Sequence, residues 1–308
     1  MQGLTLSRKY FEACGLPLIE SRFGHVRDRI AAGLAGDGSE CFGFDDELSR
    51  DHDWGPGFCL WLTADDYRDF GPALQNAIDG LPPVFEGFGP RRRSRWGEGR
   101  VGVLEIGAFY RRFIGREEPP DDPEDWLMLP ESALAACTNG EVFTDPPGEF
   151  SRRRRALLNF YPEDVRLKKL ASRCMTIGQS GQYNYPRCVQ RGDVFGARYA
   201  MTKFCADYFS AVFLLNKRYL PFYKWVGRAA STLPLLGPVS LEKITRLMGE
   251  AEPARCREII ASLCADLVGV MRAEKLTAGA GDFLADHGPE IQRRIQHPGL
   301  RERDVWIG

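Results

Sequence analysis

The apolar pattern of this chain changes near residue 151, and this change constrains the fold more than any other feature. Before it, several short runs alternate or stay apolar over the length of a strand: residues 30–34, 58–62 and 101–105. Thr63 and Asp66 resemble a capping box, which predicts that a helix follows the second of these runs. We therefore expect an α+β domain over residues 1–150.

After residue 151 the strand patterns disappear and helical patterns replace them. Apolar residues recur at helical spacing over residues 193–217, and residues 242–249 and 254–275 also favour helix. Pro253 suits the first turn of the last of these helices. We therefore expect a helical domain over residues 151–308.

Composition and charge exclude several classes of protein. The chain has 308 residues, 44% of them hydrophobic and 27% charged, which suits two folded cores rather than a disordered chain. The formal net charge of −1 provides no global field that attracts nucleic acid, so any basic surface must be local. Two arginine-rich runs qualify, residues 91–95 and 152–155, although such runs are most often solvated charge.

The cysteines and the hydrophobic runs indicate the cellular compartment in which the protein is expected. The nine cysteines include no C-x-x-C pair, which suits reduced thiols and disfavours a disulfide framework or a zinc knuckle. The first ten residues lack the apolar core of a signal peptide, and the apolar run near residues 209–215 is too short to span a bilayer. We expect a cytoplasmic protein with no membrane partner.

The segment between the first two expected strands carries the residues best suited to chemistry. Gly38 would let the backbone approach a phosphate closely, and Ser39 offers an N–H and a hydroxyl. Asp51 and Asp53 follow on either side of His52. If this segment is extended, the two aspartates share one face with Cα atoms about 6.5–7 Å apart. Such a pair can hold divalent cations about 3.5–4 Å apart, the spacing of two-metal phosphoryl chemistry.

Gly38-Ser39 followed by Asp51-His52-Asp53 resembles the Gly-Ser…Asp-x-Asp signature of the DNA polymerase β-like nucleotidyltransferase superfamily. Residues 38–53, 183–187 and 221–225 resemble one bacterial branch of it, an uncharacterised domain-of-unknown-function family. The resemblance implies a catalytic domain over residues 1–150, built on a mixed sheet with flanking helices. It also implies that the helical domain over residues 151–308 binds the acceptor, as in aminoglycoside nucleotidyltransferases.

The resemblance also implies roles for individual residues. Asp51 and Asp53 match the ligands of Mg²⁺ or Mn²⁺, and Gly38 and Ser39 match the pair that binds a nucleoside triphosphate. Glu105 is the best match to the third catalytic carboxylate, although it could instead be a surface residue of its strand. The implied reaction transfers a nucleoside monophosphate to a hydroxyl and releases pyrophosphate. The acceptor stays open among a small molecule, a protein side chain and an RNA end.

Four further side chains are candidates for nucleotide binding: Arg50, Tyr183, Arg187 and Lys224. Aromatic faces and guanidinium groups suit bases and phosphates. Tyr183 and Arg187 could equally form a packing patch between the domains. Lys224 could instead lie over the aromatic residues beside it.

Two other functions stay open. Without a third carboxylate, the same fold would be a catalytically weak or inactive nucleotide-binding module. His52 and Asp53, with His25 upstream, also suggest an HD-type metallophosphohydrolase. That site requires helices, whereas the Gly-Pro-Gly of residues 55–57 and the apolar run after it favour a strand. The chain has four histidines, so imidazole ligands are scarce.

Overall fold

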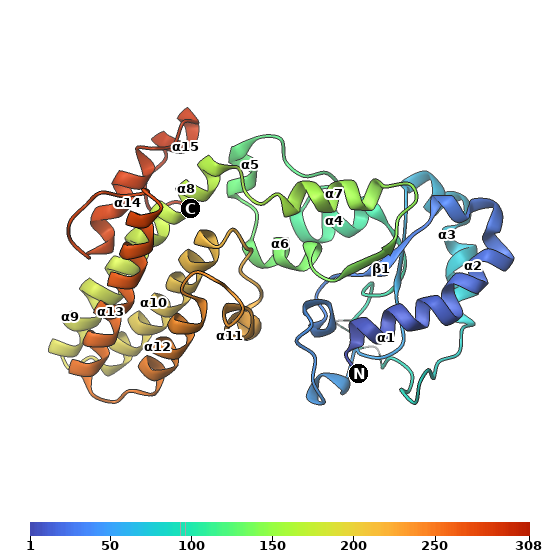
Figure 1. Ribbon diagram of the computed structural model, residues 1–308, viewed down its shortest axis with the longest axis horizontal. Helices are drawn as coiled ribbons and strands as arrows, with labels where there is room; N and C mark the ends of the chain where they lie inside the picture. The colour runs from blue at the N-terminus through green and yellow to red at the C-terminus, as the bar shows by residue number, and fades with distance from the viewer. Residues whose placement is uncertain (93, 96) are drawn as a thin grey trace. The chain divides into compact units, whose positions relative to one another are not determined.

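The structure is a computed structural model that describes residues 1–92, 94–95 and 97–308. The chain folds into two compact units (Figure 1). Unit 1 comprises residues 1–119 and 132–159, and unit 2 comprises residues 120–131 and 160–308. The short segment 120–131 therefore belongs to the second unit, although residues of the first unit flank it on both sides in sequence.

Unit 1 is built from a sheet and the helices that cover it. Its strands are β1 (Ala31–Leu34), β2 (Cys59–Leu62), β3 (Gly102–Glu105) and β4 (Glu141–Thr144). Its helices are α1 (Gly3–Tyr10), α2 (Leu16–Phe23), α3 (Ala64–Asp79), α4 (Ile106–Ile114), α6 (Glu131–Thr138) and α7 (Glu149–Leu158). The expected α+β class is confirmed for this part of the chain.

The sheet is mixed, with the strand order β3-β2-β1-β4. β1 runs antiparallel to β2 and β4, whereas β2 and β3 are parallel. Gly33 lies opposite Cys59, and Cys59 is in register with Gly102. The end of β1 and the starts of the three other strands therefore meet at one end of the sheet, which we call the Leu34 end. We call the opposite end, where β3 finishes, the Glu105 end.

Helices cover both faces of this sheet, because successive residues of a strand point to opposite sides. Leu60 and Leu62 of β2 pack into a buried cluster that includes residues of α1, α2 and α3. Trp61 points to the other face and stacks on Phe150 of α7, with ring centroids 3.8 Å apart. Phe109 of α4 packs edge-on against the same tryptophan. The sheet is thus the middle layer of unit 1.

Local signals set the boundaries of the element that follows β2. The backbone N–H of Asp66 donates to the Thr63 hydroxyl at 3.2 Å, and that hydroxyl donates to the Asp66 carboxylate at 2.9 Å. Thr63 thereby satisfies a backbone donor that would otherwise lack a partner at the start of α3. The predicted N-cap at Thr63 is confirmed, but the Asp66 carboxylate accepts from the Thr63 hydroxyl and not from its backbone N–H, so the reciprocal bond of a capping box is not formed.

Unit 2 is helical, and its described residues contain no strand. Its helices are α5 (Pro123–Leu127), α8 (Glu163–Ile177), α9 (Tyr185–Gln190), α10 (Val194–Leu215), α11 (Val226–Ala230), α12 (Gly237–Gly249), α13 (Pro253–Ala273), α14 (Leu284–Gln292) and α15 (Pro298–Glu302). Pro253 starts α13 as predicted. Among the residues that the structure describes, no helix is both long and apolar enough to cross a membrane.

Candidate functional site

The loop between β1 and β2 holds both the Gly-Ser and the Asp-x-Asp segments, and it begins and ends at the Leu34 end of the sheet. Arg91 joins the two segments. One nitrogen of its guanidinium donates to Glu40 Oε1 at 2.6 Å, and another donates to the Gly55 carbonyl at 3.4 Å. The side chains of Arg91 and Glu40 are nearly fully buried, so removal of either would leave an uncompensated buried charge.

The start of α1 packs against the same loop. The Gly3 N–H and the Trp54 indole N–H both donate to Asp45 Oδ2, at 2.7 and 3.0 Å. A Cβ at Gly3 would lie 2.6 Å from both the Trp54 indole nitrogen and the Glu40 side chain, so only glycine fits there. Sequence reasoning did not pair Glu40 with Arg91 or Asp45 with Gly3, because these partners are distant in the chain.

Asp53 is a buried aspartate whose two carboxylate oxygens both accept hydrogen bonds. The Ser94 N–H donates to Oδ1 at 2.8 Å, and the Ser94 hydroxyl donates to Oδ2 at 2.6 Å. The Arg100 guanidinium lies 3.7 Å from Oδ2. Burial alone would raise the pKa of Asp53, but the hydrogen bonds from Ser94 and the charge of Arg100 outweigh it, so this pKa lies below its ordinary value.

The backbone from Asp51 to Asp53 is not extended, which corrects the expectation that the two carboxylates share one face. Asp51 has helical dihedral angles, φ −68° and ψ −35°, whereas Asp53 has a left-handed φ of +52°. The Asp51 side chain is 67% exposed and contacts His52 Nδ1 at 2.7 Å. The Asp53 side chain is 3% exposed and points into the loop. The expected spacing required a strand, and this segment is a bend.

Glu105 lies at the other end of the sheet from this loop. It is in register with Leu62, the last residue of β2, about 10 Å along the strands from the Cys59–Gly102 pair. Its carboxylate caps α4 by accepting from the N–H groups of Gly107 and Ala108, at 2.8 and 3.1 Å. The expectation that Glu105 joins Asp51 and Asp53 in one metal site is therefore corrected: it is the N-cap of a helix.

These donors, as arranged, do not fit a pair of divalent cations. Within the described part of the chain, no group of three or more His, Cys, Asp or Glu side chains is placed to hold a metal ion. The Asp53 oxygens are already occupied by Ser94 and approached by Arg100, and Glu105 is at the far end of the sheet. This arrangement does not assemble the Mg²⁺ or Mn²⁺ site that the sequence predicts.

Gly38 and Ser39 differ in what surrounds them. A Cβ at Gly38 would overlap the Glu40 carboxylate, so the glycine leaves room for this buried acid. Ser39 begins a short 3-10 helix (Ser39–Phe42) and is half-buried. Among the described residues, no hydrogen-bond partner is found for its hydroxyl. The serine is therefore the member of the pair that is free to contact a ligand.

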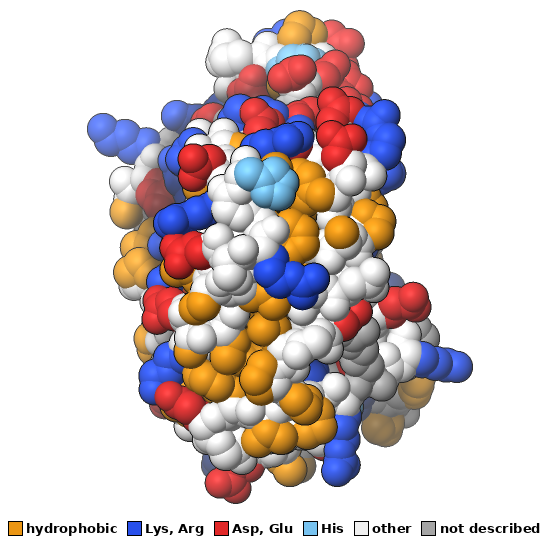
Figure 2. All heavy atoms as spheres, turned by 90° about the vertical axis from the view of Figure 1, so that its right-hand side faces the viewer, with side chains coloured by type: hydrophobic (Ala, Val, Ile, Leu, Met, Phe, Trp, Pro, Cys, Tyr) orange, Lys and Arg blue, Asp and Glu red, His pale blue; other side chains and the backbone are white. Residues whose placement is uncertain are grey.

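Arg50 and several arginines of the two basic runs in unit 1 contact other side chains. The Arg50 guanidinium lies 5.0 Å from the Trp54 ring centroid and 5.4 Å from that of Phe88. Arg152 pairs with Glu118 at 2.8 Å, and the neighbouring Arg153 pairs with Glu149 at 2.7 Å. Arg93 of the other run lies outside the described residues. Figure 2 shows basic and acidic side chains interspersed on the face that it draws, in keeping with this pairing.

One further cation reaches the Leu34 end from α4. Arg112 donates to Asp37 Oδ2 at 2.8 Å, and to the carbonyls of Glu98 and Gly99 at 3.3 and 3.2 Å. Both members of the Asp37–Arg112 pair are partly exposed. Sequence reasoning missed Arg112, because nothing in the local pattern of α4 marks it as a partner of Asp37.

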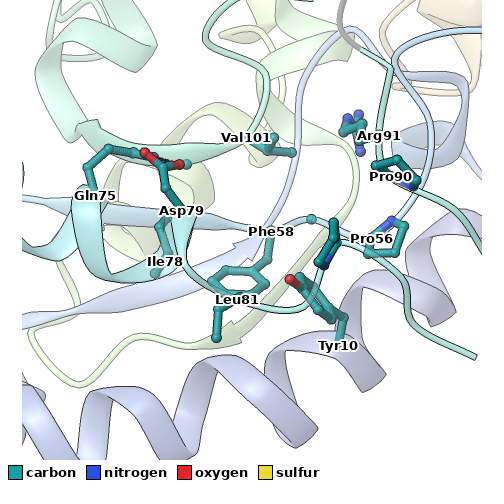
Figure 3. A pocket seen from close by; sticks show the side chains of 13 residues that line it. Tyr10, Pro56, Phe58, Gln75, Ile78, Asp79, Leu81, Pro90, Arg91 and Val101 are labelled. Carbon is teal, nitrogen blue, oxygen red and sulfur yellow. Dashed lines mark hydrogen bonds between the residues drawn. The ribbon is translucent and has the colours of Figure 1, made fainter.

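A cavity of about 200 Å³ opens beside Arg91 at the Leu34 end (Figure 3). Its walls combine apolar residues with a few polar ones: Tyr10, Phe58, Ile78, Leu81, Val101, Gln75 and Asp79. Gln75 accepts a hydrogen bond from the Val103 N–H and donates to Asp79, at 2.7 and 2.8 Å. The cavity is smaller than the roughly 300–1,000 Å³ of ordinary ligand pockets, so it would hold one ring rather than a whole nucleotide.

The remaining candidates belong to unit 2. The Arg187 guanidinium lies 4.9 Å from the ring centroid of the exposed Tyr183. The Lys224 ammonium lies 4.7 Å from the Trp225 ring centroid. The alternative in which Lys224 lies over a neighbouring aromatic residue is therefore confirmed.

Comparison with known proteins adds a partial match. A family model described as a domain of unknown function (DUF4037) matches residues 126–226. That range includes residues 183–187 and 221–225, two of the segments in which the sequence resembles a domain-of-unknown-function family. The chain is also similar to a solved nucleotidyltransferase-like protein from Exiguobacterium sibiricum, at 12% identity over 94% of this chain and 81% of that one, with a TM-score of 0.38. A likeness this distant carries no argument about function. No curated protein matches the chain.

Proposed function

We propose that unit 1 binds a nucleoside triphosphate at the Leu34 end of its sheet. One observation is the main support for this proposal. The two segments of the Gly-Ser…Asp-x-Asp pattern lie in a loop that leaves and re-enters the sheet at this end, and Arg91 bridges them through Glu40 and Gly55. Residues that match a nucleotide-binding pattern in sequence are therefore also neighbours in space.

The side chains that would contact the phosphates are Ser39 and Arg112. The Ser39 hydroxyl supplies a donor that has no partner within the described residues. Arg112 can exchange Asp37 for a phosphate at little cost, because a partly exposed ion pair contributes only about 0–1 kcal/mol. The guanidinium can then donate two hydrogen bonds to phosphate oxygens. The cavity beside Arg91 offers apolar walls for the base.

Transfer of a nucleoside monophosphate to an acceptor hydroxyl is the second candidate. The observation that favours it is the exposed carboxylate of Asp51, which follows the Gly-Ser segment in the same loop. Transfer by the mechanism that the sequence suggests requires Asp53 as well. That carboxylate would first have to leave Ser94 and Arg100, so the loop would have to rearrange.

Thermal unfolding with ATP, GTP, CTP and UTP tests the proposal, with each nucleotide measured in EDTA and in Mg²⁺. A ligand at a hundredfold excess over its Kd stabilises the folded state by about 2.7 kcal/mol. That corresponds to a rise in Tm of several degrees, at roughly 2–4 °C per kcal/mol for large domains. We expect the rise in EDTA as well as in Mg²⁺. A rise only in Mg²⁺, with pyrophosphate release, would instead favour transfer. No rise with any nucleotide would refute both functions.

A further inference from the structure

The segment between α10 and α12 of unit 2 combines cations with exposed aromatic rings. Residues 208–241 include no Asp or Glu, yet they include four basic residues: Lys217, Arg218, Lys224 and Arg228. We propose that residues 217–228 bind single-stranded nucleic acid. These residues belong to unit 2, and the proposal does not depend on the nucleotide site proposed for unit 1.

Two aromatic rings of this segment are exposed, although buried residues lie just before them and two positions after them. Pro221 and Trp225 are buried and anchor the backbone. Between them, Phe222 is 49% exposed and Tyr223 is 78% exposed. Their ring centroids lie 4.3 Å apart with the ring planes at 45°. The two rings therefore form a small aromatic surface held in place from both sides, which is what base stacking requires.

The cations near these rings are available to phosphates. Lys217 and Arg218 are exposed in the turn that ends α10, where their N–H groups donate to the carbonyls of Leu214 and Phe213. Neither Lys217, Arg218 nor Lys224 forms an ion pair within the described part of the chain. The Lys224 ammonium is positioned by the Trp225 ring, 4.7 Å away. Cations thus precede and follow the aromatic pair in sequence.

A single strand fits this surface better than other anionic ligands do. Every base has a face that can stack on Phe222 or Tyr223, whereas the bases of a duplex are already stacked on one another. A strand also offers successive phosphates to cations on both sides of the rings. A membrane surface would require a long amphipathic helix, and the helices that this segment itself contributes to, the 3-10 turn Tyr223–Trp225 and α11, are short.

Fluorescence anisotropy on the full chain tests this proposal. The probe is a labelled oligouridine of about a dozen nucleotides, within the range of roughly 4–16 that single-strand sites occupy. Duplex RNA of the same length, UTP and anionic lipid vesicles serve as competitors. We expect Tyr223→Ala to weaken binding by roughly five- to a hundredfold, because stacking on one aromatic ring contributes about 1–3 kcal/mol per base. Lys224→Ala should reduce the slope of log K against log salt by about 0.7.

Tyr199→Ala is the matched control, because this exposed tyrosine lies on α10 outside the segment. It should bind the oligouridine as the wild type does. Binding that survives both Phe222→Ala and Tyr223→Ala overturns the proposal. So does the absence of oligouridine binding at low salt, or stronger competition by duplex or vesicles than by unlabelled single strand. Both rings are exposed, so these variants should fold, which circular dichroism checks.

Discussion

Ser94 donates both its backbone N–H and its hydroxyl to the carboxylate of Asp53, at 2.8 and 2.6 Å. This contact ties the β1–β2 loop to the segment that leads into β3. Asp53 adopts a left-handed φ of +52°, and Gly97 leaves room for its carboxylate, since a Cβ there would overlap it. The aspartate that the motif marks as a metal ligand is, in this arrangement, an anchor of the loop.

The two aspartates of the motif should therefore differ in their effect on stability. Asp53→Asn removes the charge that Arg100 faces and places an amide group against Ser94, so it should lower the free energy of unfolding by about 1–3 kcal/mol. Asp51→Asn changes an exposed side chain and should stay within about 0.5 kcal/mol of the wild type. Urea denaturation at pH 7 measures both. Equal losses in the two variants would contradict this role of Asp53.

The depressed pKa of Asp53 predicts how this stabilisation depends on pH. As the pH falls, the unfolded chain binds a proton at this residue before the folded protein does. The stabilisation is therefore complete above the unfolded value of about 3.9 and is lost as the pH falls through the lower pKa of the folded protein. The difference in unfolding free energy between wild type and Asp53→Asn should shrink below about pH 4. If the difference in unfolding free energy between wild type and Asp53→Asn stayed constant from pH 7 down to acid unfolding, the stabilisation would not come from the Asp53 carboxylate.

Lys168 of unit 2 predicts a change on the alkaline side. Its buried ammonium donates to Gln292 and to the carbonyls of Arg303 and Asp304, at 2.7, 3.0 and 2.7 Å. Burial lowers its pKa to about 8, although the charge of Asp304 opposes this shift. Between that value and the unfolded value of about 10.4, the unfolded chain binds more protons, so stability should rise with pH in this window.

Lys168→Met should remove this alkaline rise and lower stability at pH 7, because three partly buried acceptors lose the hydrogen bonds that the buried ammonium donates. Lys203→Met is the control for the slope, since that lysine is largely exposed, although its partner Asp207 on α10 is buried. It should keep the slope of the wild type between about pH 8 and 10. The same slope in Lys168→Met would assign the rise to another group.

The elements that the sequence predicts are those with local signals. The apolar run 58–62 contains the strand β2 (Cys59–Leu62), and Thr63 ends this strand by capping α3. The placement of Glu105 has no such signal. If β3 ran antiparallel to β2, its last residue would lie at the Leu34 end, and the periodicity of residues 101–105 is the same for either direction. The bend at Asp53 depends on Ser94 and Gly97, which are distant in sequence.

Glu105 should act on stability alone. Glu105→Ala removes the acceptor for two N–H groups at the start of α4 and should cost about 1 kcal/mol. Because its side chain lies at the far end of the sheet, the stabilisation by nucleotide should not change. Melting curves of this variant with and without nucleotide separate the two effects. Loss of the nucleotide shift in Glu105→Ala would restore this residue to the binding site.

The most direct test of the account is the nucleotide-induced change in Tm for Ser39→Ala and Arg112→Ala, measured beside Glu105→Ala. We expect a rise of several degrees in the wild type and in Glu105→Ala, at nucleotide concentrations well above Kd. Most of this rise should be lost in Ser39→Ala and in Arg112→Ala. An undiminished rise in both of these variants, or no rise in the wild type with any nucleotide, would contradict a nucleotide site at the Leu34 end.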